Sequence, residues 1–166
     1  DIAREDEAIQ SLQQLVSRFP TSEFSPSSLY SIADYYYNAQ EYELALENYE
    51  MVLEMFPDSE VAEKIPETLS ELRETIAYLE YEKGFTLFQQ AREMNDDPAL
   101  YRQAIEVFRN VADKYPFTES EIGSYSNMGY SYEVIGEWQN AVEAFDMVIR
   151  RYEEGAEVGQ DAFTFA

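Results

Sequence analysis

The segment PSSLYSIADYYYNAQEYELALENYEMVLEMFPDS, residues 26–59 of the 166-residue chain, carries the pattern that decides the fold. Apolar residues recur at intervals of three and four in Ser28–Ala39 and again in Glu43–Phe56, as one buried helix face requires. Each run also holds a small residue, Ala33 in the first and Ala45 in the second. The segment therefore predicts two helices that cross closely at the small residues.

The pattern returns along the chain as a small residue, a large apolar residue four positions later and, usually, Pro twelve positions later. The four sets are Ala8/Leu12/Pro20, Ala45/Tyr49/Pro57, Ala104/Phe108/Pro116 and Ala141/Phe145/Glu153, the last with Glu in place of Pro. The matching small residues of the preceding helices are Ala33, Gly84 and Gly129. We predict that each Pro ends a second helix and that Thr21, Ser59 and Thr118 cap the helices that follow.

This pattern resembles the tetratricopeptide repeat, whose signature columns run aromatic, Leu, Gly, Tyr, Ala, Phe, Ala, Pro over two helices. Residues 26–59 match with Leu29, Ile32, Ala33, Tyr36, Ala45, Tyr49, Val52 and Pro57. Residues 122–155 match with Tyr125, Met128, Gly129, Tyr132, Ala141, Phe145, Val148 and Glu153. The resemblance implies an all-α fold, a right-handed superhelical solenoid of antiparallel helix pairs. The copy around Gly84 departs from it, with Glu80 and Lys83 in apolar columns.

We expect residues 1–166 to form one solenoid fragment with an irregular middle. Its parts are a partial repeat 1–25, a repeat 26–59, an extra helix 60–76, an irregular repeat 77–118, a repeat 122–155 and the start of a further repeat 156–166. Both ends fall inside repeats, so we expect a piece of a longer array. In that case Phe163 and Phe165 pack on a continuation, and exposed repeat ends can drive self-association.

The middle of the chain predicts one long helix from Pro66 to Met94. Pro66 suits a first turn and Asn95 suits an end. The apolar stripe expected on it is Leu69, Leu72, Ile76 and Leu79. Asp97 is then expected to cap the next helix. Two interpretations stay open: a repeat lengthened without function, or a projecting helix that forms a surface for a partner or a second copy.

A finer resemblance concerns the 37-residue step from Ala8 to Ala45 and from Ala104 to Ala141, together with the segments that join the units. It is similar to bacterial cell-envelope members of the family, which include the outer-membrane assembly lipoprotein and the periplasmic partner of the Tol system. The resemblance implies an exported scaffold that holds other envelope proteins. It favours the periplasm or cell envelope over the cytoplasm.

Composition excludes several kinds of chemistry. The chain has no His and no Cys, which removes imidazole bases, thiol nucleophiles, disulfides and the usual zinc sites. Its 34 acidic residues stand against 11 basic ones, a net charge of −23 that repels nucleic acid and anionic lipid. No apolar run approaches the roughly 20 residues of a membrane span.

We expect no catalysis, no metal and no cofactor. The charge either solubilises the chain, steers a basic partner or reflects a salt-rich habitat.

The resemblance also implies a concave groove lined by the first helix of each pair. The groove residues we predict are Tyr30, Asp34, Tyr37, Asn38, Tyr81, Phe85, Phe88, Gln89, Asn127, Tyr130 and Glu133. Aromatic and acidic groups suit a peptide or partner helix with aromatic, Pro or basic side chains. For Phe85 and Phe88, burial in the core is an equal alternative. The predicted function is a non-catalytic protein-interaction scaffold; the alternative is a small-ligand receptor that works with a transporter.

Overall fold

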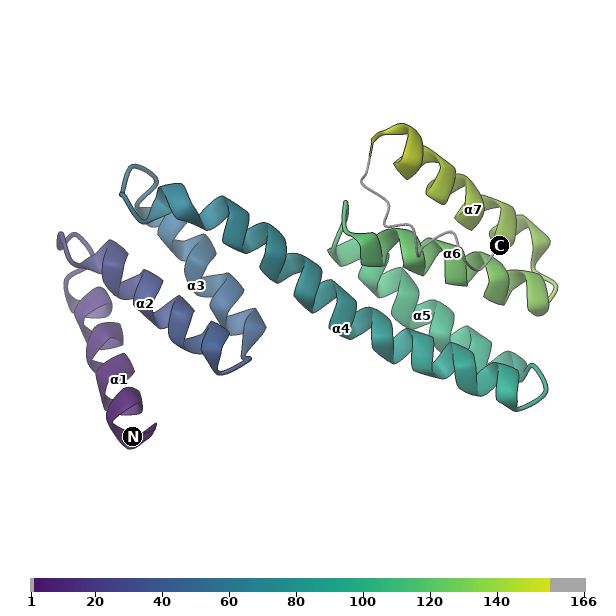
Figure 1. Cartoon of the computed structure of the whole chain (residues 1–166), viewed down its shortest axis with the longest axis horizontal. Coiled ribbons are helices and arrows are strands. Elements are labelled where there is room, and N and C mark those ends of the chain that lie inside the picture. Colours follow the sequence, from purple (N-terminus) through teal and green to yellow (C-terminus); the bar gives the residue numbers. More distant parts are fainter. Residues whose placement is uncertain (1, 156–166) are drawn as a thin grey trace. The chain divides into compact units, whose positions relative to one another are not determined.

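The structure is a computed structural model of the chain, and it describes residues 2–155, with side chains from Glu7 onward. The described residues form seven α-helices, a short 3-10 turn and no strand (Figure 1). The elements are α1 (Ile2–Arg18), α2 (Ser25–Asn38), α3 (Tyr42–Met55), η1 (Ala62–Lys64), α4 (Ile65–Glu93), α5 (Pro98–Lys114), α6 (Glu119–Val134) and α7 (Trp138–Glu153). This confirms the all-α prediction. The start of a further repeat at 156–166, with Phe163 and Phe165, lies outside the described residues.

The chain divides into two compact units, Asp1–Leu72 and Arg73–Ala166, so α4 contributes to both. In the first unit α2 and α3 form an antiparallel hairpin, and α1 packs on α2. Ala33 and Ala45 are both fully buried, and Tyr49 fills the space beside them with 2% of its surface exposed. The close crossing predicted from the small residues is therefore confirmed.

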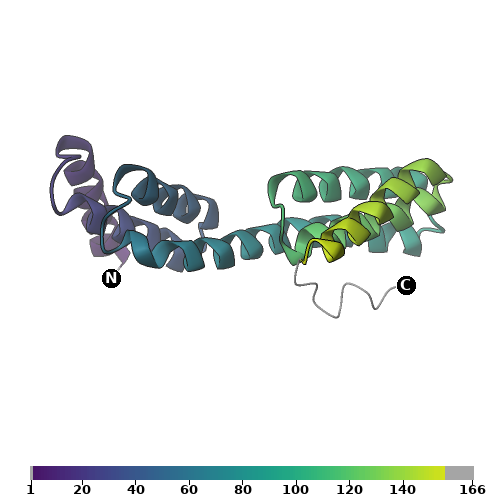
Figure 2. The same cartoon turned by 90° about the horizontal axis from the view of Figure 1, so that it is seen from above.

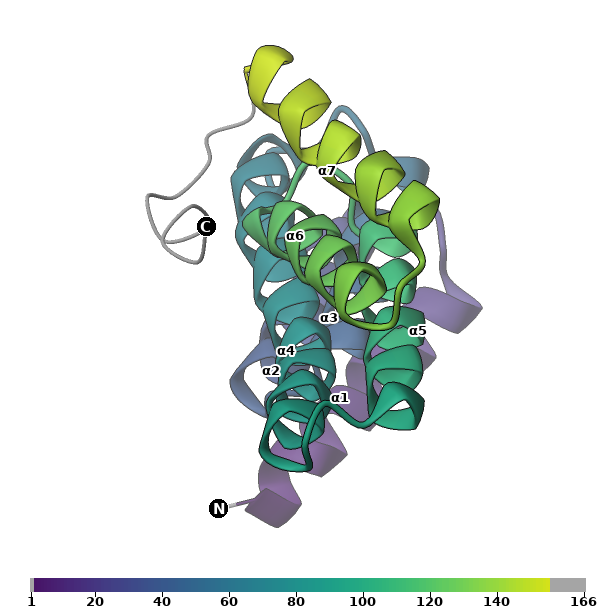
Figure 3. The ribbon, with the colours of Figure 1, turned by 90° about the vertical axis from the view of Figure 1, so that its right-hand side faces the viewer.

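In the second unit α5 runs alongside the C-terminal half of α4 (Figure 2), and α6 packs against both α5 and α7 (Figure 3). A Cβ added to Gly84 would lie 2.8 Å from the Phe108 ring on α5. A Cβ added to Gly129 on α6 would lie 2.5 Å from the Phe145 ring on α7. Glycine at these two positions lets an aromatic ring from the next helix pack directly on the backbone.

The helix ends follow the proline signals, and the capping signals in part. Helices α1, α3 and α5 end at Arg18, Met55 and Lys114, each two residues before a Pro. The hydroxyl of Thr118 accepts a hydrogen bond from the Glu121 backbone N–H (3.0 Å) and caps α6, as predicted. Ser59 accepts a hydrogen bond from the Ala62 N–H (3.3 Å), but the N-cap of η1 is Val61, so Ser59 is not the predicted helix cap. The prediction for Thr21 is wrong. Helix α2 begins at Ser25 after an intervening turn, and its N-cap Phe24 offers no side-chain acceptor.

The predicted long helix is present as α4, which has 29 residues. Beyond its end Asn95 and Asp96 have positive φ angles of 56° and 57°. The Asp97 carboxylate then caps α5 by accepting from the Ala99 N–H at 2.7 Å. One member of the predicted stripe is wrong, since Leu79 is 45% exposed. After Ile76 the buried side of α4 turns to another set of positions: Ala77, Gly84, Phe88 and Ala91.

Candidate functional site

A row of aromatic rings lies along the C-terminal half of α4. Tyr81 and Phe85 are stacked with their ring centroids 5.9 Å apart, and Phe85 stacks on Phe88 at 6.2 Å. Phe88 in turn meets Tyr101 of α5 edge to face at 5.6 Å. The row forms because positions separated by three and four residues share one helix face. It supplies a continuous apolar wall in the second unit.

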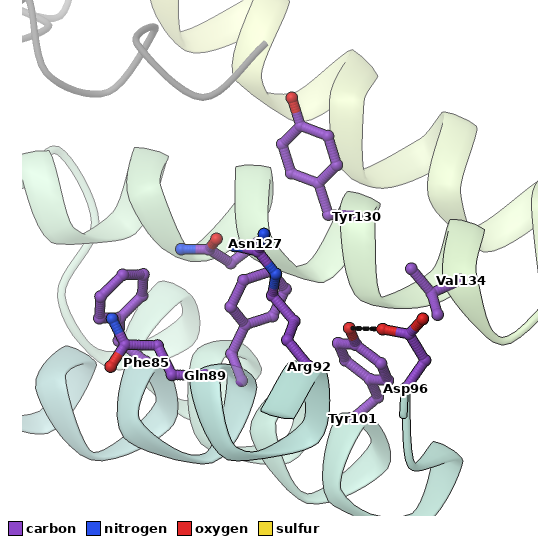
Figure 4. Close-up of a pocket in the computed structure, with 9 residues that line it drawn as sticks. Phe85, Gln89, Arg92, Asp96, Tyr101, Asn127, Tyr130 and Val134 are labelled. Atoms are coloured by element: carbon purple, nitrogen blue, oxygen red, sulfur yellow. Dashed lines mark hydrogen bonds between the residues drawn. The ribbon is translucent and has the colours of Figure 1, made fainter. Parts of the chain in front are cut away.

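This wall borders a cavity of about 560 Å³ between the ends of α4, α5 and α6 (Figure 4). Its lining residues are Phe85, Phe88, Gln89, Arg92, Asp96, Tyr101, Asn127, Tyr130 and Val134. A second hollow of about 290 Å³ shares Phe85, Asn127 and Tyr130 with the cavity and continues along α4 to Tyr78, Tyr81 and Glu82. The two hollows make this face of the second unit concave, and mostly aromatic with a few polar groups.

Two hydrogen bonds fix polar side chains at the cavity. The Asn127 amide donates to the Tyr81 hydroxyl at 2.8 Å, which leaves the Asn127 side-chain carbonyl oxygen as the remaining acceptor of that group. The Tyr101 hydroxyl donates to Asp96 Oδ1 at 2.9 Å (Figure 4). Burial, reinforced by this hydrogen bond, raises the pKa of Tyr101 to about 12. Burial likewise raises the pKa of Tyr81. Both phenols are therefore neutral hydrogen-bonding groups at physiological pH.

One basic side chain, that of Arg92, lines the cavity. The Arg92 guanidinium carbon lies 6.0 Å from the centre of the Phe88 ring, a cation–π distance. Asp96 lines the same cavity, so the site has one charge of each sign, although the chain as a whole is strongly acidic. The site can thus bury an apolar or aromatic group and hydrogen-bond to polar groups beside it. Within the part of the chain that the structure describes, no three carboxylates converge as ligands of a metal would.

Four of the predicted groove residues belong to the first unit, where three of them contact other side chains. The Tyr49 hydroxyl donates to the Asp34 carboxylate, and the Tyr30 ring meets Tyr49 edge to face at 5.5 Å. The pKa of Tyr49 is raised mainly by burial and to a smaller extent by its hydrogen bond to Asp34. Tyr37 lies against Tyr42 at 5.8 Å and keeps 40% of its surface exposed. Asn38, the last residue of α2, is exposed.

The remaining predicted residues belong to the second unit, and the structure brings most of them together. Phe85, Phe88, Gln89, Asn127 and Tyr130 line the cavity, and Tyr81 lines the adjoining hollow. Glu133 is exposed and lines neither hollow. Phe88 is 8% exposed within the core, as the alternative interpretation expected, and it also lines the cavity. Phe85 is half-buried. The partner-binding role of all these residues stays a prediction.

Four cavity residues were not predicted: Arg92, Asp96, Tyr101 and Val134. A sequence signal existed for Arg92, because it stands four residues after Phe88 and therefore on the same helix face. No such signal existed for Tyr101, which the repeat pattern identifies only as an aromatic position before Ala104. Its place in the cavity depends on how α5 crosses α4.

Helix hairpins joined by short turns, with small residues at the crossings and a concave aromatic face, define a helical-repeat protein of the tetratricopeptide type. Proteins of this class present extended surfaces to other proteins and act as interaction scaffolds. The model of the YfiO family, described as outer membrane lipoprotein, matches residues 2–152. The chain therefore belongs to the YfiO family, and the resemblance to cell-envelope members of the repeat family is confirmed. Membership is consistent with a cell-envelope location rather than a cytoplasmic one.

Other comparisons add little to this assignment. None of the curated proteins is significantly similar to the chain. Among solved structures, the chain is similar to a MamA RS-1 ArsTM double mutant, with 17% sequence identity and a TM-score of 0.35. That match covers 92% of this chain and 87% of the other. In residues 2–155, none of the helices combines the length and the apolar character that crossing a bilayer would need.

Proposed function

We propose that the chain is a non-catalytic scaffold of the periplasm that binds a partner polypeptide in the aromatic cavity of its second unit. The observation that supports this most is the cavity itself, which joins the ring row of α4 to polar groups from α5 and α6. Binding sites typically combine an apolar wall with a small number of placed polar groups. The cavity has this composition.

The chemistry of the cavity favours an aromatic or long apolar side chain as the anchor of the partner. Phe88 and Tyr101 both line it, and offset or edge-to-face ring contacts add to the free energy of burial. The Asn127 carbonyl oxygen and the Gln89 amide can hydrogen-bond to the backbone of the same peptide. In the first unit, exposed Tyr37 and Asn38 remain candidates for a second contact with the partner.

The small-ligand receptor is the weaker alternative. A cavity of about 560 Å³ lies in the size range of small-molecule sites, so volume alone does not discriminate. Membership of a lipoprotein family with a helical-repeat fold supports a scaffold instead. A receptor would be stabilised against heat by a solute, whereas the scaffold would respond to a polypeptide.

The test is a peptide-display selection against the wild-type chain, followed by binding measurements with the selected peptides by fluorescence anisotropy. Gln89→Trp would fill the cavity from its wall, and Gln90→Trp makes the same change at the next, exposed position of α4, which does not line the cavity. We expect selected peptides to share an aromatic or large apolar residue. We also expect Gln89→Trp to weaken their binding about tenfold or more and Gln90→Trp to leave it unchanged.

Equal binding by both variants would exclude the cavity as the site. If no peptide is selected but a solute raises the melting temperature of the wild type and not of Gln89→Trp, the receptor alternative replaces the scaffold.

A further inference from the structure

Helix α7 carries an apolar stripe on a side that residues 73–155 of its unit do not cover. Trp138, Val142 and Ile149 are 63%, 55% and 55% exposed. Phe145 lies between them and is half-buried, with its ring against Gly129 and Tyr130 of α6. We call these four residues the α7 stripe. The buried side of the helix is a different set: Ala141, Ala144 and Val148.

The spacing of the α7 stripe is the spacing of a helix–helix seam. Its members follow one another at intervals of four, three and four residues, which is the alternation of the a and d positions of a heptad. Such a row stays on one side of a helix and meets a second helix that runs nearly along it. From Trp138 to Ile149 the stripe extends about 16 Å at ~1.5 Å per residue. Side chains of a partner helix could interlock with it over this length.

Charge at the edge of the stripe selects among partners. The residues directly after its members are Gln139, Glu143, Asp146 and Arg150, and Glu153 follows Ile149 by one turn. All five are exposed. Three of these side chains are carboxylates and one, Arg150, is a guanidinium, on a chain whose net charge is −23. A second copy of the chain would bring like charges together along this edge, whereas Lys or Arg beside an apolar seam would meet the carboxylates.

We infer that the α7 stripe is a docking surface for an amphipathic helix of another protein, one with apolar residues in heptad spacing and Lys or Arg along its flanks. This surface is separate from the aromatic cavity. The stripe lies on α7, and none of its four residues lines the cavity. The inference can therefore fail without affecting the proposed function, and the reverse is also true.

The stripe contains its own reporter, because Trp138 is the only tryptophan of the chain. The experiment titrates the full chain with a designed, Trp-free helical peptide that has Leu at a and d and Lys at e and g. A scrambled peptide of the same composition and a peptide with Glu in place of Lys serve as comparisons. Docking would remove Trp138 from water, so we expect a saturable shift of its emission to shorter wavelength with the Lys peptide only.

Ile149→Asp separates seam docking from general attraction between opposite charges. The change makes the chain more acidic, so a purely electrostatic contact with the Lys peptide would strengthen. We expect binding to weaken about tenfold or more instead, as the loss of one buried aliphatic side chain implies. Leu79→Asp, at a leucine of α4 that is 45% exposed, is the matched control and should bind like the wild type. Val142→Asp repeats the test if Ile149→Asp alters the circular dichroism.

Four outcomes would overturn the inference. The first is the absence of any shift with the Lys peptide, and the second is undiminished binding by Ile149→Asp. The third is a concentration-dependent doubling of mass that Ile149→Asp abolishes, which would assign the stripe to a second copy. The fourth is an emission already shifted in the dilute free chain and unmoved by peptide, which would mean that the chain covers its own stripe.

Discussion

Glycine at two helix crossings sets the distance between neighbouring helices at the scale of single residues. Gly84 and Gly129 place the rings of Phe108 and Phe145 against helix backbone, at distances that leave no room for a methyl group. Gly123 of α6 differs, because an added Cβ would meet the Tyr81 ring at 3.1 Å, which a small movement can relieve. The same substitution at these sites therefore has different costs.

We predict that Gly129→Ala destabilises the fold and that Gly123→Ala is close to neutral. At position 129 the new methyl group would lie 2.5 Å from the Phe145 ring, and overpacking of this kind costs about 1–3 kcal/mol. The gain in helix propensity, about 0.5–1 kcal/mol, offsets only part of that cost. Urea unfolding at equal ionic strength measures both variants. Equal free energies of unfolding for the two would show that Phe145 moves aside freely.

The second prediction at this scale concerns Tyr101 at high pH. Its pKa is raised from 10.0 to about 12 by burial and by the bond to Asp96. Between these values the unfolded chain loses the phenol proton while the folded chain keeps it, so stability falls as pH rises. Tyr101→Phe should lose less stability than the wild type between pH 10 and 12, by urea unfolding. Asp96→Asn should be intermediate, and identical slopes for all three would contradict the assigned environment.

At the scale of elements, one buried ion pair ties α7 to α6. Glu121 is fully buried, and its carboxylate accepts from Arg151 Nε and Nη2 at 2.9 and 2.8 Å and from the Phe117 N–H at 2.7 Å. The hydrogen bonds to Glu121 raise the pKa of Arg151. The Arg151 guanidinium also lies 4.7 Å from the Phe117 ring centre. The pair holds the C-terminal end of α7 at the turn that begins α6.

We predict that Arg151→Met costs about 3–5 kcal/mol, because it leaves the Glu121 carboxylate buried without its cation. Arg102→Met is the matched control. It breaks the ion pair between α5 and Glu137 at the start of α7, at 2.9 Å, but both side chains there are in contact with water. An exposed pair is worth about 0.2–1 kcal/mol. Comparable losses in urea unfolding for the two variants would mean that water reaches Glu121.

Element ends were largely predictable, because Pro and capping residues act locally. The ends of α1, α3 and α5 before Pro, and the caps at Asp97 and Thr118, needed only the chain within a few residues. Thr21 failed because an extra turn separates it from α2. Leu79 failed because α4 turns a different side toward its neighbours after Ile76. Periodicity within one helix does not reveal where the neighbouring helix changes.

At the scale of the whole molecule, charge is the dominant feature. With 34 carboxylates and 11 cations, like charges repel one another throughout the folded chain. We predict that the urea midpoint at pH 7 rises as NaCl is increased from ~0.01 to ~0.15 M, because the screening length falls from roughly 30 to 8 Å. A falling midpoint would mean that the surface ion pairs outweigh the repulsion. Urea is suited to this measurement because it carries no charge.

The sequence by itself determined the class of fold, the helix pairs, the long α4, the close crossings at glycine and the exclusion of His and Cys chemistry. These follow from periodicity, small residues and breakers, all of which act over short distances along the chain. Only the tertiary structure decided which polar groups meet at the cavity. Arg92, Asp96 and Tyr101 come from different elements, and the angle at which helices cross determines whether their side chains converge. For the same reason only the structure distinguished Asp34, held by Tyr49, from a free groove carboxylate, and the exposed α7 stripe from a buried one.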